Sequence, residues 1–145
     1  MRRGKARGDQ GSASVEFVLI AVLFLAFVFG IIELGIYMFD QHVLTNASRE
    51  GARLGIIMQV PRVSNNEIIA KVQAYADDHM VNFSGTGSLN VTIAPEEGSR
   101  GVTGPQVLFG TPLVVTVTYP FDFLFLSGFG FGPITMTAET RMRME

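Results

Sequence analysis

Glu16 is the residue whose type and position raise the first chemical question. It places a carboxylate at the start of a long apolar run, behind a basic N-terminal tail and five residues after Gly11. An ionisable side chain inside a membrane segment is costly by itself and indicates a functional contact with a partner. The alternative is an ionised, hydrated glutamate at the cytoplasmic interface, and Glu16 alone leaves both interpretations open.

Residue types suited to catalysis or metal binding are otherwise sparse. The chain has no cysteine, which removes disulfides, thiolate ligands and cysteine nucleophiles. The Gly-Phe-Gly-Phe-Gly run at 128–132 has no lysine and is not a phosphate-binding loop. The candidate metal ligands are isolated, or adjacent in sequence so that they do not converge on one ion; they are His42, Asp77, Asp78, His79, Glu96 and Glu97. We therefore expect neither an enzyme, nor a metal site, nor a cofactor.

Composition and charge limit the size of the domain and the kinds of partner. With 145 residues, 48% of them hydrophobic, the chain can hold one membrane segment and one modest globular head. Residues 1–11 carry four basic residues and one acid, so their net charge is +3. Because the whole chain has a net charge of −2, the remaining residues have a net charge of −5. An acidic head of this kind indicates no nucleic-acid partner.

The apolar run predicts a permanent membrane anchor. Phe17–Phe39 is interrupted by one charge, Glu33, and would be about 34 Å long as a helix, against about 30 Å for a hydrocarbon core. The basic tail before it and Asp40 after it predict a cytoplasmic N-terminus and an external head. A cleaved secretory signal fits poorly, because the run exceeds the usual 7–15 residues and no small-x-small site follows it near 37–41.

A single helix is predicted to continue past the membrane, from about Ser14 to about Met58. No proline occurs before Pro61, and apolar residues recur at helical spacing along the second half. Within that half, Ala47, Gly51 and Gly55 repeat every four residues and form a small-residue groove. The groove could admit another backbone, or it could let the helix pack on its own head, and the sequence supports both equally.

The rest of the chain predicts a small head of mixed α and β structure. Ser64 and Glu67 have the spacing of a capping box and open a second helix to about Met80. Alternating residues predict three strands, at 89–93, 113–119 and 134–144, forming an antiparallel sheet that covers the outer half of the long helix. Residues 95–111 are predicted to be a long loop. The Phe/Gly-rich stretch 120–133 is predicted to be a wide hairpin whose phenylalanines fold under the sheet; the alternative is an exposed partner or membrane surface.

Residues 2–39 as a whole resemble the processing site of type IV prepilins: a basic leader, a glycine, four small or apolar residues, a glutamate and an apolar helix. The resemblance implies a cut between Gly11 and Ser12 by a membrane prepilin peptidase, with Glu16 as the fifth residue of the mature chain. It also implies that Glu16 pairs with the N-terminal amine of a neighbouring subunit. Breaking such a pair leaves an uncompensated charge, which penalises subunits that dock wrongly.

The resemblance narrows to TadE-like minor pilins, or pseudopilins, of tight-adherence (Tad) systems. It rests on the motifs Gly30-Ile31-Ile32-Glu33-Leu34-Gly35 and Ser48-Arg49-Glu50-Gly51-Ala52-Arg53 and is specific over residues 8–58. Major pilins of these systems are much shorter and usually have Tyr where this chain has Phe17. TadF-like proteins are the near neighbour. The family implies a type IV pilin-like α+β fold.

Charged residues of the two motifs receive separate interpretations. Glu33, about 25 Å along the helix from Glu16, is predicted to be an acid at the outer membrane boundary, with a contact between subunits as the alternative. Arg49 and Arg53 flank Glu50 at spacings that permit an intrahelical pair. Surface pairs contribute little, so this segment is also predicted to pack between helix and head.

The resulting hypothesis is a minor pseudopilin that helps to assemble an adhesive pilus or secretion filament. It divides the chain into a leader (1–11), a transmembrane helix (12–40), the outer half of the helix (41–60) and a periplasmic or extracellular head (61–145). Expected partners are the prepilin peptidase, other minor and major pilins, the inner-membrane assembly platform and membrane lipid, with no nucleic acid and no small-molecule substrate. The alternative is an uncleaved bitopic scaffold of the bacterial inner membrane.

Overall fold

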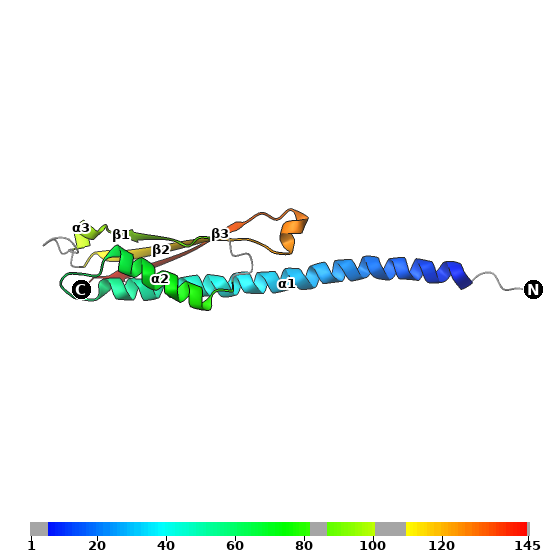
Figure 1. Ribbon diagram of the computed structural model, residues 1–145, viewed down its shortest axis with the longest axis horizontal. Coiled ribbons are helices and arrows are strands. Elements are labelled where there is room, and N and C mark those ends of the chain that lie inside the picture. The colour runs from blue at the N-terminus through cyan, green and yellow to red at the C-terminus, as the bar shows by residue number, and fades with distance from the viewer. Residues whose placement is uncertain (1–5, 82–86, 101–109, 145) are drawn as a thin grey trace, which may run out of the picture.

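One long helix forms the spine of the molecule. The computed structural model describes residues 6–81, 87–100 and 110–144, and in it α1 runs from Ala6 to Ile56. The helix begins before the predicted Ser14, because the residues from Ala6 onward include no proline that would stop it. It ends ahead of Pro61, whose ring disfavours helical backbone at the preceding residue. Figure 1 shows the blue N-terminal half of α1 projecting away from the head.

The second helix is the predicted one. Helix α2 spans Asn65–His79, and its capping box is complete: the Ser64 hydroxyl accepts from the Glu67 N–H at 3.3 Å, and the Glu67 carboxylate accepts from the Ser64 N–H at 2.8 Å. Its buried face is Ile68, Val72 and Ala76. The sequence therefore marked the start of α2.

A three-stranded antiparallel sheet completes the head. The strands are β1 (Asn90–Ala94), β2 (Pro112–Phe121) and β3 (Ile134–Arg143), in the order β1-β2-β3. Each predicted strand is present, with ends that agree to within two residues. Of the stretch predicted as a loop, residues 95–111, one part forms a short helix, α3 (Glu97–Arg100), and residues 101–109 lie outside the described residues.

The core lies between the sheet and the two helices. Alternate residues of β2 are buried against α1 and α2, and Met136 and Ala138 extend this inner face onto β3. The opposite face of β3 is exposed and polar. The buried residues of β2 are Leu113, Val115, Val117, Tyr119 and Phe121. This α+β arrangement, one long helix packed on a small antiparallel sheet with a second helix, is the predicted pilin-like fold.

The Phe/Gly-rich connection between β2 and β3 divides in two. Phe121 is buried and packs edge-on against Tyr37, with ring centroids 5.5 Å apart, and Phe125 packs on Phe29 at 4.7 Å. Beyond the short turn η1 (Leu126–Phe129), the ring of Phe131 is exposed, as is that of Phe129. The prediction that the phenylalanines fold under the sheet is therefore right for the first half of the connection and wrong for its tip, where Phe129 and Phe131 lie beyond the end of β2 and remain exposed.

We expect the capping box to make the stability of α2 pH-dependent. Donation from the Ser64 N–H and hydroxyl holds the pKa of Glu67 below its usual value. The stabilisation from the capping box is therefore fully present above the unfolded-state pKa of Glu67 and is lost as the pH falls through its lower folded-state pKa. Glu67→Gln is expected to lower the urea midpoint at pH 7, with the difference from the parent shrinking in acid. Asp78→Asn in the last turn is the matched control; because an acid there opposes the helix dipole, a midpoint at pH 7 that is equal or higher is expected.

Candidate functional site

The predicted processing residues lie on the free half of α1. Gly11, Ser12 and Glu16 are all exposed, as is every residue from 11 to 20. The Gly11–Ser12 bond is inside helical backbone, which a protease would have to unwind. Glycine costs a helix about 1 kcal/mol relative to alanine, so Gly11 makes this unwinding easier. Within the described residues, no hydrogen bond or ion pair of the Glu16 side chain is formed.

The free half of α1 also carries a long apolar surface. The helix from Gly11 onward is long and apolar enough to cross a membrane, and none of its most apolar window is buried. Its large hydrophobic side chains point outward on all sides; they include Phe17, Leu19, Val22, Leu23, Phe24, Phe27, Ile31 and Ile32. A surface of this kind is stable in lipid or against other apolar helices.

Glu33 is 7% exposed and contacts the chain's own head. Its carboxylate accepts hydrogen bonds from the backbone N–H groups of Phe125 and, at 2.9 Å, Leu126. It therefore holds the β2–β3 connection against α1, a role that neither interpretation from the sequence contained. A contact of Glu33 with another subunit stays a prediction.

The small-residue groove is occupied by the head. A Cβ atom on Gly51 would lie 2.4 Å from Val72 Cγ2, and one on Gly55 would lie 2.4 Å from Leu113 Cδ2 and 2.8 Å from Ile68 Cδ1. Both glycines are buried. This packing accounts for them without another subunit, and their predicted part in assembly remains untested.

The residues of the second motif, 48–53, lie on different faces of α1. Arg49 and Arg53 are exposed, whereas Ala52 is fully buried. Glu50 forms an ion pair with Lys71 of α2 at 3.6 Å. Glu50 therefore links the long helix to α2, whereas the permitted intrahelical pair with Arg53 is not among the ion pairs of the described residues. The predicted packing of Arg49 and Arg53 between helix and head stays a prediction.

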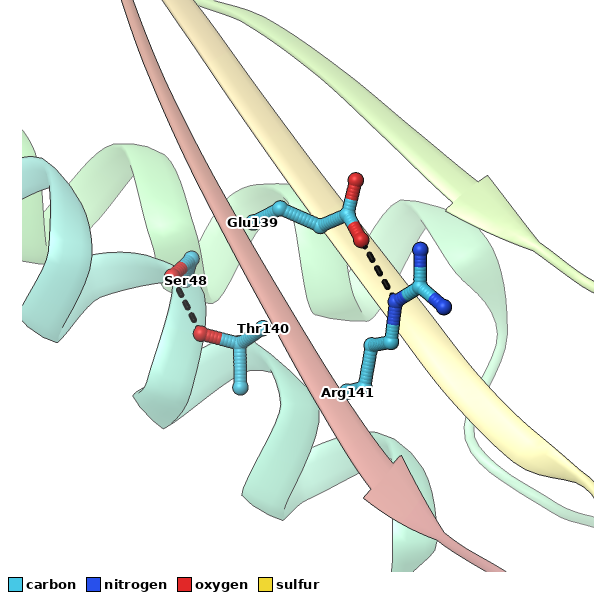
Figure 2. A network of polar contacts seen from close by, with 4 residues as sticks. All are labelled: Ser48, Glu139, Thr140 and Arg141. Carbon is cyan, nitrogen blue, oxygen red and sulfur yellow. Dashed lines mark hydrogen bonds and ion pairs between the residues drawn. The ribbon is translucent and has the colours of Figure 1, made fainter.

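Polar contacts fix α1 along β3. The hydroxyls of Ser48 and Thr140 are 2.6 Å apart, and Gln41 donates to the Thr137 carbonyl at 2.9 Å. Figure 2 shows Thr140 pointing to Ser48 on one side of β3, with the exposed Glu139–Arg141 pair on the other. Because these contacts set the height of the sheet along the helix, they also set where the β2–β3 connection meets α1.

A hollow of about 270 Å³ lies between α1 and the β2–β3 connection, lined by apolar residues and three carboxylates, Glu33, Asp40 and Asp122. Asp40 is 1% exposed and accepts from the Val81 N–H at 2.9 Å. Burial, reinforced by Asp40 and Asp122, raises the pKa of Tyr119. Two of these carboxylates, Glu33 and Asp40, accept hydrogen bonds from backbone N–H groups. No group of three metal-ligating side chains occurs in the described residues.

Sequence reasoning also missed a buried cation, Arg100. It is fully buried and donates to the Val63 carbonyl at 3.4 Å and to the side chain of Asn65, and burial lowers its pKa. Glu97 accepts from the Asn65 backbone N–H. Together they fix α3 to the start of α2. No local signal distinguishes this arginine from a solvated one, because its acceptors lie 35 and 37 residues away in the chain.

A comparison with family models gives a match to the N-terminal third of the chain. Residues 11–53 match a family described as TadE-like protein. This segment is TadE-like. The match supports a TadE-like protein of the Tad pilus system and covers less than half of the chain. The TadE-like segment covers the free half of α1 and most of the half that packs on the head. Neither the curated proteins nor the solved structures contain a match to the chain.

Proposed function

We propose that this protein is a minor pilin or pseudopilin that takes part in assembling a tight-adherence pilus or secretion filament. The observation that carries the proposal is the start of the TadE-like segment at residue 11. There Gly11 precedes the exposed apolar stretch of α1, whose most apolar window is not buried by the head. The buried polar side chains of Glu33 and Ser48 connect α1 to the head, which fits a structural role.

Processing after Gly11 would release the basic leader and create a cationic amine on Ser12. Glu16 is exposed on the same helix, so a neighbouring subunit could approach it from the side. In lipid, an unpaired carboxylate is expensive, and the amine of a neighbour would neutralise it. Glu16 is thus the proposed assembly contact, and the prepilin peptidase and other minor and major pilins are the proposed partners.

Placement in the membrane follows from the charges at the two ends of the apolar run. The basic leader is proposed to lie in the cytoplasm and the head outside, in the periplasm or on the cell surface. The inner-membrane assembly platform and a separate cytoplasmic ATPase would act on this anchored subunit.

Mass spectrometry of the N-terminus in the native host tests the processing. We expect a mature chain that begins at Ser12, and we expect Gly11→Ala to accumulate as a slower-migrating precursor, because the residue before the cut is no longer a glycine. Gly35→Ala, which changes a glycine in open space on the same helix, should be processed normally. An intact N-terminus with the peptidase present would contradict the proposal and favour the uncleaved scaffold.

Glu16→Ala separates processing from assembly. The leader and Gly11 are unchanged, so cleavage is expected to continue. The number of pili per cell is expected to fall, because the carboxylate that would pair with the N-terminal amine of a neighbouring subunit is missing. Electron microscopy and immunoblots of the same cells measure both. Normal piliation would remove the assembly role of Glu16.

A further inference from the structure

The β2–β3 connection ends beside the membrane half of α1. We call residues 123–133 the tip segment. In Figure 1 its orange η1 turn lies at the end of the head nearest the free half of α1. Glu33 accepts hydrogen bonds from two of its N–H groups, the rings of Phe29 and Phe125 are 4.7 Å apart, and a Cβ on Gly30 would contact Leu126 at 3.8 Å. The tip segment is therefore fixed at the level of residues 29–33.

The tip segment exposes large apolar side chains and carries no charge. Leu124, Phe129 and Phe131 are 66%, 60% and 57% exposed, and Ile134 next to them is 44% exposed. No charged residue occurs from 123 to 138. These exposed apolar residues lie at the end of the head nearest the free half of α1, whereas the outer face of β3 is polar. Such a surface indicates contact with an apolar partner.

Several backbone N–H groups of the tip segment are hydrogen-bonded within the segment or to Glu33, which lowers the cost of placing them in lipid. The N–H groups of Gly128, Gly130 and Phe131 donate to carbonyls within the segment. Those of Phe125 and Leu126 donate to Glu33, and the Ser127 hydroxyl donates to the Leu124 carbonyl. Pro133 has no N–H to satisfy.

The depth of the tip segment matches that of an interfacial element. Glu33 lies six residues before Phe39, the predicted outer end of the membrane run, or about 9 Å along the helix axis. Amphipathic elements at membrane surfaces bury their apolar face to about 5–10 Å.

We propose that the tip segment is a second membrane contact, seated in the outer leaflet beside α1, with phospholipid acyl chains covering Leu124, Phe129 and Phe131. Glu33 is the positioning residue that keeps it there. The contact would fix the height and tilt of the head above the bilayer while the subunit waits for assembly. This inference rests on the membrane placement proposed above.

Depth-dependent quenching tests the contact, because the chain has no tryptophan. Phe129→Trp is placed in the full-length protein in phosphatidylcholine vesicles, with or without bromine on the acyl chains near the glycerol. Phe131→Trp is the second reporter. Phe24→Trp reports the membrane anchor, and Val60→Trp, fully exposed beyond the far end of α1, reports solvent. Far-UV circular dichroism checks that each variant is folded.

Emission from Phe129→Trp and Phe131→Trp is expected to fall by about half in the brominated vesicles, as for a side chain within about 10 Å of the surface. Emission from Val60→Trp should not change. Quenching of Phe24→Trp without quenching of either tip reporter would overturn the tip contact and leave the anchor intact; a protein partner would then be the better occupant. No quenching of Phe24→Trp would overturn the membrane placement itself.

Discussion

Gly51→Val is expected to lower the free energy of unfolding of the head by about 3 kcal/mol. A Cβ at this position would already lie 2.4 Å from Val72 Cγ2 and 3.3 Å from Ile68 Cγ2. Val72 cannot turn aside cheaply, because a β-branched side chain on a helix has one strongly preferred rotamer and this one is fully buried. The helices would have to move apart, which would also stretch the Glu50–Lys71 pair.

The measurement is urea unfolding of the full chain in detergent, followed by near-UV circular dichroism of the tyrosines. Tyr37, Tyr75 and Tyr119 all pack in or against the head. Gly35→Val is the matched control: it makes the same change on the same helix, where nothing lies within 4 Å, and should shift stability by about 0.5 kcal/mol or less. An equal loss in both variants would contradict the packing explanation.

Removing methyl groups from the opposing side chain should rescue the clash. Val72→Ala alone leaves a cavity, and Gly51→Ala alone overfills the contact. In the double variant, the methyl group added at position 51 occupies space that the Val72 methyl groups vacate. The combined loss is therefore expected to be smaller than the sum of the two single losses, by about 1 kcal/mol or more. Strict additivity would show that the two residues do not share one contact.

Glu33→Ala is expected to release the tip segment from α1 while the rest of the head stays folded. Two backbone donors, on Phe125 and Leu126, lose a charged acceptor in a site where Glu33 is 7% exposed. Hydrogen bonds to charged groups contribute about 1.5–3 kcal/mol each, so exchange of these two amides should accelerate about a hundredfold. Amide hydrogen exchange read by mass spectrometry measures this directly.

Two controls separate the carboxylate from other effects of the substitution. Glu33→Gln keeps one acceptor oxygen in nearly the same shape and should give an intermediate rate. Glu139→Gln removes an exposed acid paired with Arg141 and should leave exchange in the tip segment unchanged, since surface pairs contribute little. Unchanged protection in Glu33→Ala would show that ring packing on Phe29 alone holds the tip.

These contacts bear on how the protein could assemble. The face of α1 that carries Gly51 and Gly55 is covered by the chain's own α2 and β2, so its small residues serve the head. The uncovered surface is the apolar half of α1, with Glu16 near its start. Assembly through Glu16 would thus leave the packing of the head intact.

The sequence by itself determined the elements of the fold, because their signals are local. The absence of proline and the apolar periodicity mark α1, the Ser64–Glu67 spacing marks the start of α2, and strict alternation marks the three strands. The burial of β2 follows the same alternation, with Val115 and Val117 on its buried face. Gly11 and Glu16 belong to a motif that is defined by short-range spacing, so their residue types and positions were enough to mark them as a candidate site.

Only the tertiary structure decided which groups meet across the chain. Glu33 and its donor on Phe125 are 92 residues apart, and a charge inside an apolar run looks the same whether its partner is water, another subunit or a distant loop. The sequence could not choose between the two uses of the small-residue groove, because a glycine that admits Val72 has the same spacing as one that admits another subunit. Such choices depend on the summed packing of all elements, which brings remote donors, acceptors and side-chain volumes to one place.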